Sequence, residues 1–107
     1  SNTGYALLAT IIERVSGLTY AEFLKEYIFK PLKMKNSFVY NRRLSPKQIK
    51  NYAFGYLFIK SQNKYILPDE YEKTKMVYWL DGVVGDGTVN SNVIDLLKWD
   101  RALYSPK

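Results

Sequence analysis

The first sixteen residues carry the pattern that most constrains the fold, because their apolar side chains recur at the spacing of a helix. At about 3.6 residues per turn they form one wide stripe: Tyr5, Leu7, Leu8, Ile11, Ile12 and Val15. A helix that is apolar over this much of its circumference is typical of the centre of a core. We therefore predict a helix over residues 4–16, capped by Asn2 or Thr3 and ended by Gly17 in a left-handed conformation.

A second helix is predicted over residues 20–29. Thr19-Tyr20-Ala21-Glu22 has the form of a capping box, in which the threonine hydroxyl and the glutamate carboxylate each accept a hydrogen bond from the other residue's backbone N–H. Pro31 ends this helix, because the residue before a proline avoids helical geometry. The face expected to be buried consists of Phe23, Leu24, Tyr27 and Ile28.

The remaining sequence predicts a hairpin and two further helices. A serine followed by proline favours a helix over residues 46–52, and two β-prone runs around a polar turn favour a hairpin over 56–67. The last helix is predicted over 93–104. Asn92 is its expected cap, and Asp95 lies where the helix dipole favours a negative charge.

Composition places these elements in one domain of the α+β class. The chain has 107 residues, of which 47% are apolar, and this is enough for one small core. An apolar run at 77–80 is expected to be buried as well. Helix dominates and the antiparallel hairpin is small, and no linker or repeat divides the chain, so we interpret residues 1–107 as one domain or part of one.

The chain contains no cysteine and no histidine. This excludes Cys–His and Ser–His–Asp catalysis, thiolate metal sites and imidazole ligands within it. We expect no metal and no cofactor, and any catalysis would use serine, lysine, tyrosine or carboxylate groups.

The net charge of +6 is spread along the chain. A basic chain can bind nucleic acid, but no nucleic-acid-binding module is recognisable, so a solvated lysine-rich surface is favoured and no nucleic-acid partner is expected. No apolar run approaches the roughly 20 residues of a membrane span. The first residues also lack the pattern of a signal peptide.

Three stretches, in this order and spacing, resemble a known family. The first runs from Ser1-Asn2-Thr3-Gly4-Tyr5 through Gly17, the second from Phe23-Leu24 through Ile28-Phe29-Lys30-Pro31-Leu32 and Met34, and the third from Gly85-Asp86-Gly87 through Lys98-Trp99. They are similar to the Tyr-Ser-Asn segment, the Pro-Leu-Gly-Met turn and the Gly-rich loop of class C β-lactamases and related peptidases and esterases. The middle, about 42–79, is generic.

The resemblance implies an internal fragment of a penicillin-recognising serine hydrolase of the β-lactamase/D-Ala-D-Ala peptidase type. In that family a serine in Ser-x-x-Lys takes the acyl group of a β-lactam, a peptidoglycan stem peptide or an ester. The tyrosine of Tyr-x-Asn assists proton transfer, and the asparagine donates a hydrogen bond to the substrate's amide carbonyl. The family also implies an extracytoplasmic location, in the periplasm or cell envelope.

Only Asn2 carries a family role onto this chain, as a substrate-binding residue. The tyrosine would precede Ser1, while the Ser-x-x-Lys helix and the downstream Lys-Thr-Gly strand are absent, so no catalytic residue is assigned and the isolated chain is expected to be inactive. Lys33 replaces the usual glycine of the Pro-Leu-Gly-Met turn. Ser1-Asn2 is also a dipeptide left by tag removal, but Thr3-Gly4-Tyr5 continues the family pattern in register.

Other patterns have simpler interpretations. Ser61-Gln62-Asn63-Lys64 matches Ser-x-x-Lys but lies in the predicted hairpin turn, whereas the chemistry needs both side chains one helical turn apart. The glycines at 82–87 lack the lysine of a phosphate loop, and the acidic residues at 69–72 fit no calcium loop.

Two other function classes stay open. One is a stand-alone basic and aromatic module that binds an anionic polymer or a cell-wall glycan, and the other is a structural interaction domain. A chain cut from a larger fold would expose apolar surface, so self-association is expected.

Overall fold

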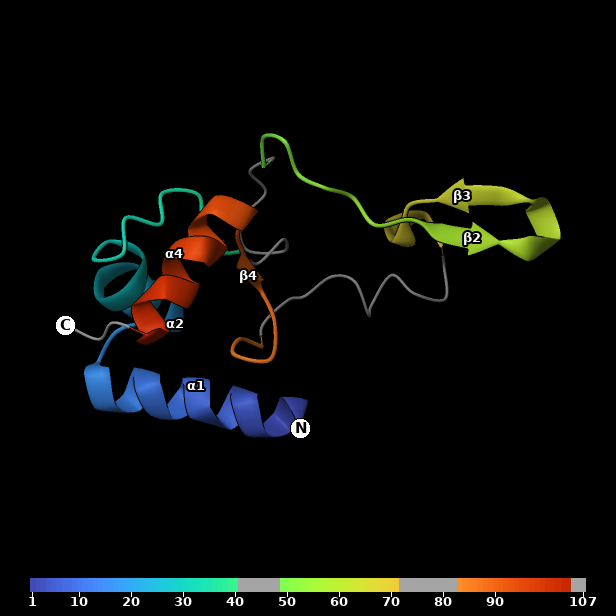
Figure 1. Ribbon diagram of the computed structural model, residues 1–107. Coiled ribbons are helices and arrows are strands. Elements are labelled where there is room, and N and C mark those ends of the chain that lie inside the picture. Colours follow the sequence, from blue (N-terminus) through green and yellow to red (C-terminus); the bar gives the residue numbers. More distant parts are fainter. Residues whose placement is uncertain (41–48, 72–82, 105–107) are drawn as a thin grey trace. The chain divides into compact units, whose positions relative to one another are not determined.

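The computed structural model describes residues 1–40, 49–71 and 83–104, and it shows an α+β chain that is about half helical, with two small antiparallel sheets (Figure 1). The chain groups into two compact units, residues 1–40 with 83–107, and residues 41–82. The first unit contains α1 (Asn2–Ser16), α2 (Tyr20–Leu24), η1 (Lys25–Phe29), β1 (Phe38–Val39), β4 (Val89–Asn90) and α4 (Val93–Tyr104). The second contains β2 (Leu57–Ile59), η2 (Lys60–Gln62), β3 (Lys64–Ile66) and η3 (Pro68–Glu70).

Helix α1 begins two residues earlier than predicted. Its N-cap is Ser1, whose hydroxyl accepts a hydrogen bond from the N–H of Gly4 over 3.4 Å. The prediction that Asn2 or Thr3 caps the helix is therefore wrong: the Ser1 hydroxyl already serves the free N–H groups, and Asn2 becomes the first helical residue. The predicted C-terminus is confirmed, because Gly17 has a φ of 71° and its N–H donates to Glu13.

The second helical stretch covers residues 20–29, as predicted. The capping box is confirmed: the Thr19 hydroxyl accepts from the N–H of Glu22 at 3.2 Å, and the Glu22 carboxylate accepts from the N–H of Thr19 at 2.9 Å. The second half, η1, is wound as a π-helix.

The turn after η1 is a Schellman motif that places Lys33 in the left-handed region. The N–H of Met34 donates to the carbonyl of Phe29 at 2.8 Å, and the N–H of Lys33 donates to that of Lys30 at 3.0 Å. Lys33 accordingly has a φ of 57°. Glycine adopts this conformation without steric cost, so the lysine changes the local backbone energy and leaves the fold intact.

A small core lies inside the first unit. Its buried side chains are Leu24, Phe29 and Met34, with Tyr20, Phe23, Ile28, Leu32 and Val39 packed against them. Strands β1 and β4 pair antiparallel beside it, with Phe38 opposite Asn90 and Val39 opposite Val89. Two-residue strands are too short to show alternating apolar and polar residues in the sequence, so this pair was not predicted.

The stripe on α1 is largely exposed, which corrects the prediction that this helix is central to the core. Ala9 is buried at 1% exposure, whereas Leu7 and Ile11 are 60% and 55% exposed. On α4 the apolar side is also open, with Leu96 and Leu103 at 54% and 67%. The helical spacing of these apolar residues predicted the helices correctly, but no element among the described residues covers their apolar faces.

In the second unit the predicted hairpin is confirmed, with β2 and β3 paired antiparallel and Phe58 opposite Tyr65. The predicted helix over 46–52 is wrong where it is described: 49–52 are not helical, and Asn51, in a turn at 50–51, has a φ of 60° that a helix cannot continue. Its first part, 46–48, and the apolar run 77–80 lie outside the described residues.

Candidate functional site

Asn2 lies at the exposed N-terminal end of α1, in its first helical position. Neither oxygen nor nitrogen of its side-chain amide has a hydrogen-bond partner in the described chain. An amide supplies two N–H donors and one acceptor oxygen, so this group is free to bind a ligand carbonyl. The chemistry suits the substrate-binding role that the sequence predicts for it.

The loop before β4 lies against α1 close to this position (Figure 1). Gly85 has a φ of 98°, and a Cβ placed on it would lie 2.5 Å from the carbonyl oxygen of Tyr5 and 2.6 Å from the Cβ of Ala9. Both distances are too short for any side chain. Gly85 thus marks a position where this loop needs glycine, both for its backbone conformation and for its close approach to α1.

Thr88, in the same loop, is buried and also has a left-handed φ, of 70°. This conformation is costly for a β-branched residue. Its carbonyl accepts hydrogen bonds from the N–H of Tyr40 at 2.8 Å and from the side-chain amide of Asn90 at 3.0 Å. Tyr40, just after β1, and Asn90 of β4 thus hold the loop in a strained conformation, which is common beside functional sites.

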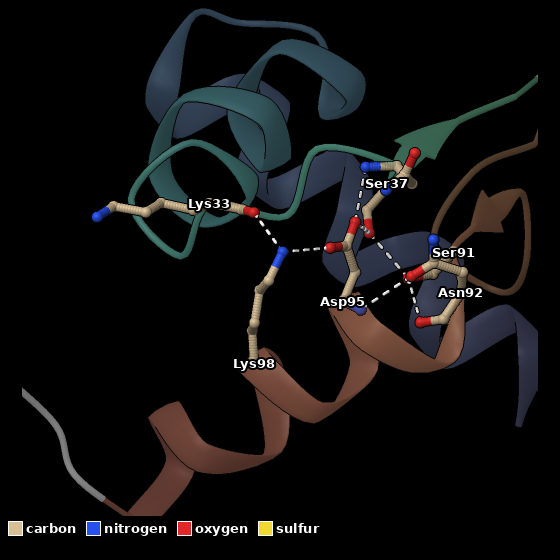
Figure 2. A network of polar contacts seen from close by, with 7 residues as sticks. Lys33, Ser37, Ser91, Asn92, Asp95 and Lys98 are labelled. Carbon is tan, nitrogen blue, oxygen red and sulfur yellow. Dashed lines mark hydrogen bonds and ion pairs between the residues drawn. The ribbon is translucent and has the colours of Figure 1, made fainter.

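A buried carboxylate connects α4 to the opposite side of this unit. Asp95 is 0% exposed, and Figure 2 shows the groups that surround it. One carboxylate oxygen accepts from the N–H of Asn36 at 2.7 Å and from the hydroxyl of Ser37 at 3.0 Å. The other oxygen accepts from the ammonium of Lys98 at 2.6 Å. Both carboxylate oxygens accept hydrogen bonds from the protein and the side chain is fully buried, so this carboxylate is structural and cannot reach a substrate.

Two further contacts extend the network (Figure 2). Lys98 also donates to the backbone carbonyl of Lys33 at 2.6 Å, which fixes the Schellman turn. The hydroxyls of Ser37 and Ser91 lie 2.8 Å apart. Because Ser37 uses its only hydrogen on Asp95, Ser91 is the donor in this pair. The network thereby ties α4, β1 and the segment after β4 together.

The pKa of Asp95 follows from these contacts. Burial acts to raise the pKa of this carboxyl, but hydrogen bonds from Lys98, the N–H of Asn36 and Ser37, together with the charge of Lys98, outweigh it and hold the pKa below its ordinary value. Asp95 is thus ionised at neutral pH.

The other sequence patterns remain non-catalytic in the structure. Ser61 lies in the one-turn η2 and Lys64 begins β3, with the left-handed Asn63 between them. They do not stack on a helix, so the serine lacks the geometry of an activated nucleophile. Among the residues that can be described, no group of three acidic side chains could hold a metal ion.

A groove of about 620 Å³ lies along α2, the Schellman turn and β1. Its floor includes Phe29 and Met34, and four lysines line it: Lys25, Lys30, Lys33 and Lys35. Lys30 is paired with Glu26 at 2.6 Å, while the ammonium groups of Lys33 and Lys35 form no ion pair within the described chain. Sequence analysis did not single out this groove, because its lysines are scattered.

Comparison with solved structures defines the class of this α+β chain. It is similar to the octameric penicillin-binding protein homologue from Pyrococcus abyssi, with a TM-score of 0.70 and 33% sequence identity over 94% of this chain and 20% of that one. Among curated proteins it is 56% identical to Penicillin-binding protein 4* of Bacillus subtilis, over 97% of this chain and 23% of the relative. It is 32% identical to the putative penicillin-binding protein PbpX of the same organism, over 99% and 24%.

The Beta-lactamase family model matches residues 1–106. The chain belongs to the Beta-lactamase family, as its sequence resemblance predicts, and it spans about a quarter of the length of these curated relatives. No helix in the described parts of the chain is long and apolar enough to cross a membrane.

The sequence resemblance names Asn2, but it does not predict the Asp95 network or the packing of Gly85 on α1. For Asp95 the sequence indicates only an interaction with the helix dipole, because its partner Asn36 lies 59 residues earlier. The loop contact at Gly85 could have been suspected from the paired glycines, but nothing in the sequence shows that Ala9 is its partner.

Proposed function

We propose that this chain forms one wall of the acyl-transfer cleft of a penicillin-recognising serine hydrolase. Asn2 donates a hydrogen bond from its side-chain amide to the substrate's amide carbonyl. The observation that carries the proposal is the exposed, unpartnered amide of Asn2 at the start of α1, in a chain matched to this family over its length.

The reaction of the whole enzyme is acyl transfer through a serine supplied from elsewhere in the fold. The serine oxygen attacks the carbonyl carbon of a β-lactam, a D-Ala-D-Ala peptide or an ester, the bond to the leaving group breaks, and the leaving group takes the proton. Asn2 holds the substrate's amide carbonyl while this occurs. Ser61, which matches Ser-x-x-Lys in the described part of the chain, lacks the geometry of an activated nucleophile. We therefore propose that the chain is inactive by itself, and that the whole enzyme acts outside the cytoplasm.

A chimera tests the role of Asn2. In it, this chain replaces the matching stretch of the 56%-identical Bacillus subtilis relative, and acylation by a labelled penicillin is timed. We expect Asn2→Ala to slow acylation about 10-fold or more, because a preorganised donor is lost. Thr3→Ala, beside it in α1, is the matched control. Equal rates in all three proteins would contradict the proposal.

The lysine-lined groove favours a second candidate function, the binding of an anionic polymer. Lys33 and Lys35 line the groove, and their ammonium groups form no ion pair within the described chain, so they can bind an anion. Binding of a labelled polyphosphate chain is then expected to fall with salt and to be lost in a Lys33→Glu, Lys35→Glu double variant. It is expected to persist in a Lys60→Glu, Lys64→Glu control in the second unit. Equal binding by both variants would contradict this candidate.

A further inference from the structure

Gly85 meets the face of α1 that also carries Asn2. Residues at positions i, i+3 and i+7 lie on one side of a helix, and Asn2, Tyr5 and Ala9 have this spacing. The two atoms nearest to Gly85 belong to Tyr5 and Ala9. The loop is therefore seated on the same side as the Asn2 amide, one to two turns along the helix.

This contact requires glycine for two independent reasons. The φ of 98° is a conformation that residues with a Cβ rarely adopt, and a Cβ would also strike the backbone of α1 at 2.5 Å. Neither neighbour can move easily, because the Tyr5 carbonyl belongs to the helix backbone and Ala9 is 1% exposed. A side chain at this position must push the loop and the helix apart.

The loop is fixed from its other end as well. Thr88 is held by Tyr40, which follows β1, and by Asn90 of β4. Ser37, which precedes β1, bonds to Asp95 of α4. Gly85 thus lies where the hydrogen-bonded segments around β1, β4 and α4 meet the helix that presents Asn2.

We propose that Gly85 is a positioning residue for the Asn2 amide: its close packing on Tyr5 and Ala9 sets how α1 presents this donor to the substrate carbonyl. The inference rests on the proposed role of Asn2 and adds the element that aligns it. A displacement of about 1 Å at a binding group can slow a reaction 100-fold, so a small shift of α1 has a measurable effect.

The contact itself can be observed in the unaltered chain by nuclear magnetic resonance. A nuclear Overhauser effect is expected between an α-hydrogen of Gly85 and the methyl group of Ala9. Its absence from a folded chain with assigned resonances would overturn the proposal without any substitution.

The functional test uses the chimera described above and a double-mutant cycle. Gly85→Ala is expected to slow acylation by labelled penicillin about 10- to 100-fold. The Asn2→Ala, Gly85→Ala double variant is expected to be no slower than Asn2→Ala alone, because a residue that acts through Asn2 has no effect once Asn2 is gone. Gly17→Ala is the control, since Gly17 has a φ of 71° but a Cβ added to it would meet nothing within 4 Å, and it is expected to acylate at the unaltered rate.

The positioning role of Gly85 and the binding role of Asn2 would fail on different results. If the effects of Asn2→Ala and Gly85→Ala multiply, or if Gly85→Ala is as fast as the control in a protein with unchanged circular dichroism, the positioning role is wrong while the role of Asn2 stands. If Asn2→Ala acylates at the unaltered rate, the proposed function fails and this inference falls with it.

Discussion

Lys33 shows at the residue scale how one side chain can oppose the backbone conformation that its turn requires. It is exposed and has a φ of 57°, a region that costs a residue with a Cβ about 1–2 kcal/mol. Glycine removes this cost but has more freedom in the unfolded chain, which offsets about 0.4–1 kcal/mol. We therefore expect Lys33→Gly to raise the free energy of unfolding by about 0.5–1 kcal/mol.

Urea denaturation monitored by circular dichroism measures this change. Lys35→Gly is the matched control, because Lys35 lies two residues away and is exposed without a left-handed φ. It is expected to lower the stability slightly. A similar loss in both variants would show that the turn does not strain Lys33.

At the element scale, the Asp95 network joins α4 to the turn and to β1, and its stability depends on pH. The pKa of Asp95 is lowered in the folded chain, so its contribution is fully present above the unfolded value of about 3.9 and is lost as pH falls through the folded pKa. We expect the free energy of unfolding to fall with acid over this range, and to fall less steeply in Asp95→Asn.

Chemical denaturation at a series of pH values below about 5 checks this slope. Asp100→Asn is the control on the same helix, because the Asp100 side chain is exposed and has no hydrogen bond or ion pair in the described chain. It should keep the acid dependence of the unaltered chain. An Asp95→Asn variant with that same dependence would show that the buried carboxylate is not linked to folding.

Elements whose signals are local could be predicted from the sequence, and those that depend on distant partners could not. The Thr19–Glu22 box and the Gly17 terminus are set by neighbouring residues, so the start of α2 and the end of α1 were predicted correctly. The β1–β4 pair joins residues about fifty positions apart, and its short strands carry no pattern of their own. The predicted helix over 46–52 is absent at 49–52, the part that the structure describes, where Asn51 is left-handed. Asn2 was assigned by family pattern, and its role stays a prediction. The glycines marked the loop at Gly85, but its partner Ala9 could not be predicted, because that close approach exists only in the folded chain.

For the whole molecule, the open apolar faces of α1 and α4 predict self-association. Leu7, Ile11 and Val15 are 60%, 55% and 83% exposed on α1, and exposed apolar surface of this kind usually becomes an interface. We expect dimers or larger species at micromolar concentration, with little weakening by salt because apolar contacts drive them. Sedimentation velocity over a range of concentration and salt measures this. A compact monomer throughout would favour the stand-alone module instead.

The central claim is that this chain contributes a wall of the cleft and not its nucleophile. Intact-mass spectrometry after incubation with a labelled penicillin tests it most directly, on the 107-residue chain and on the chimera side by side. The account predicts no covalent adduct on the chain alone and one penicillin bound per chimera. A stoichiometric adduct on the isolated chain, above all at Ser61, would contradict it.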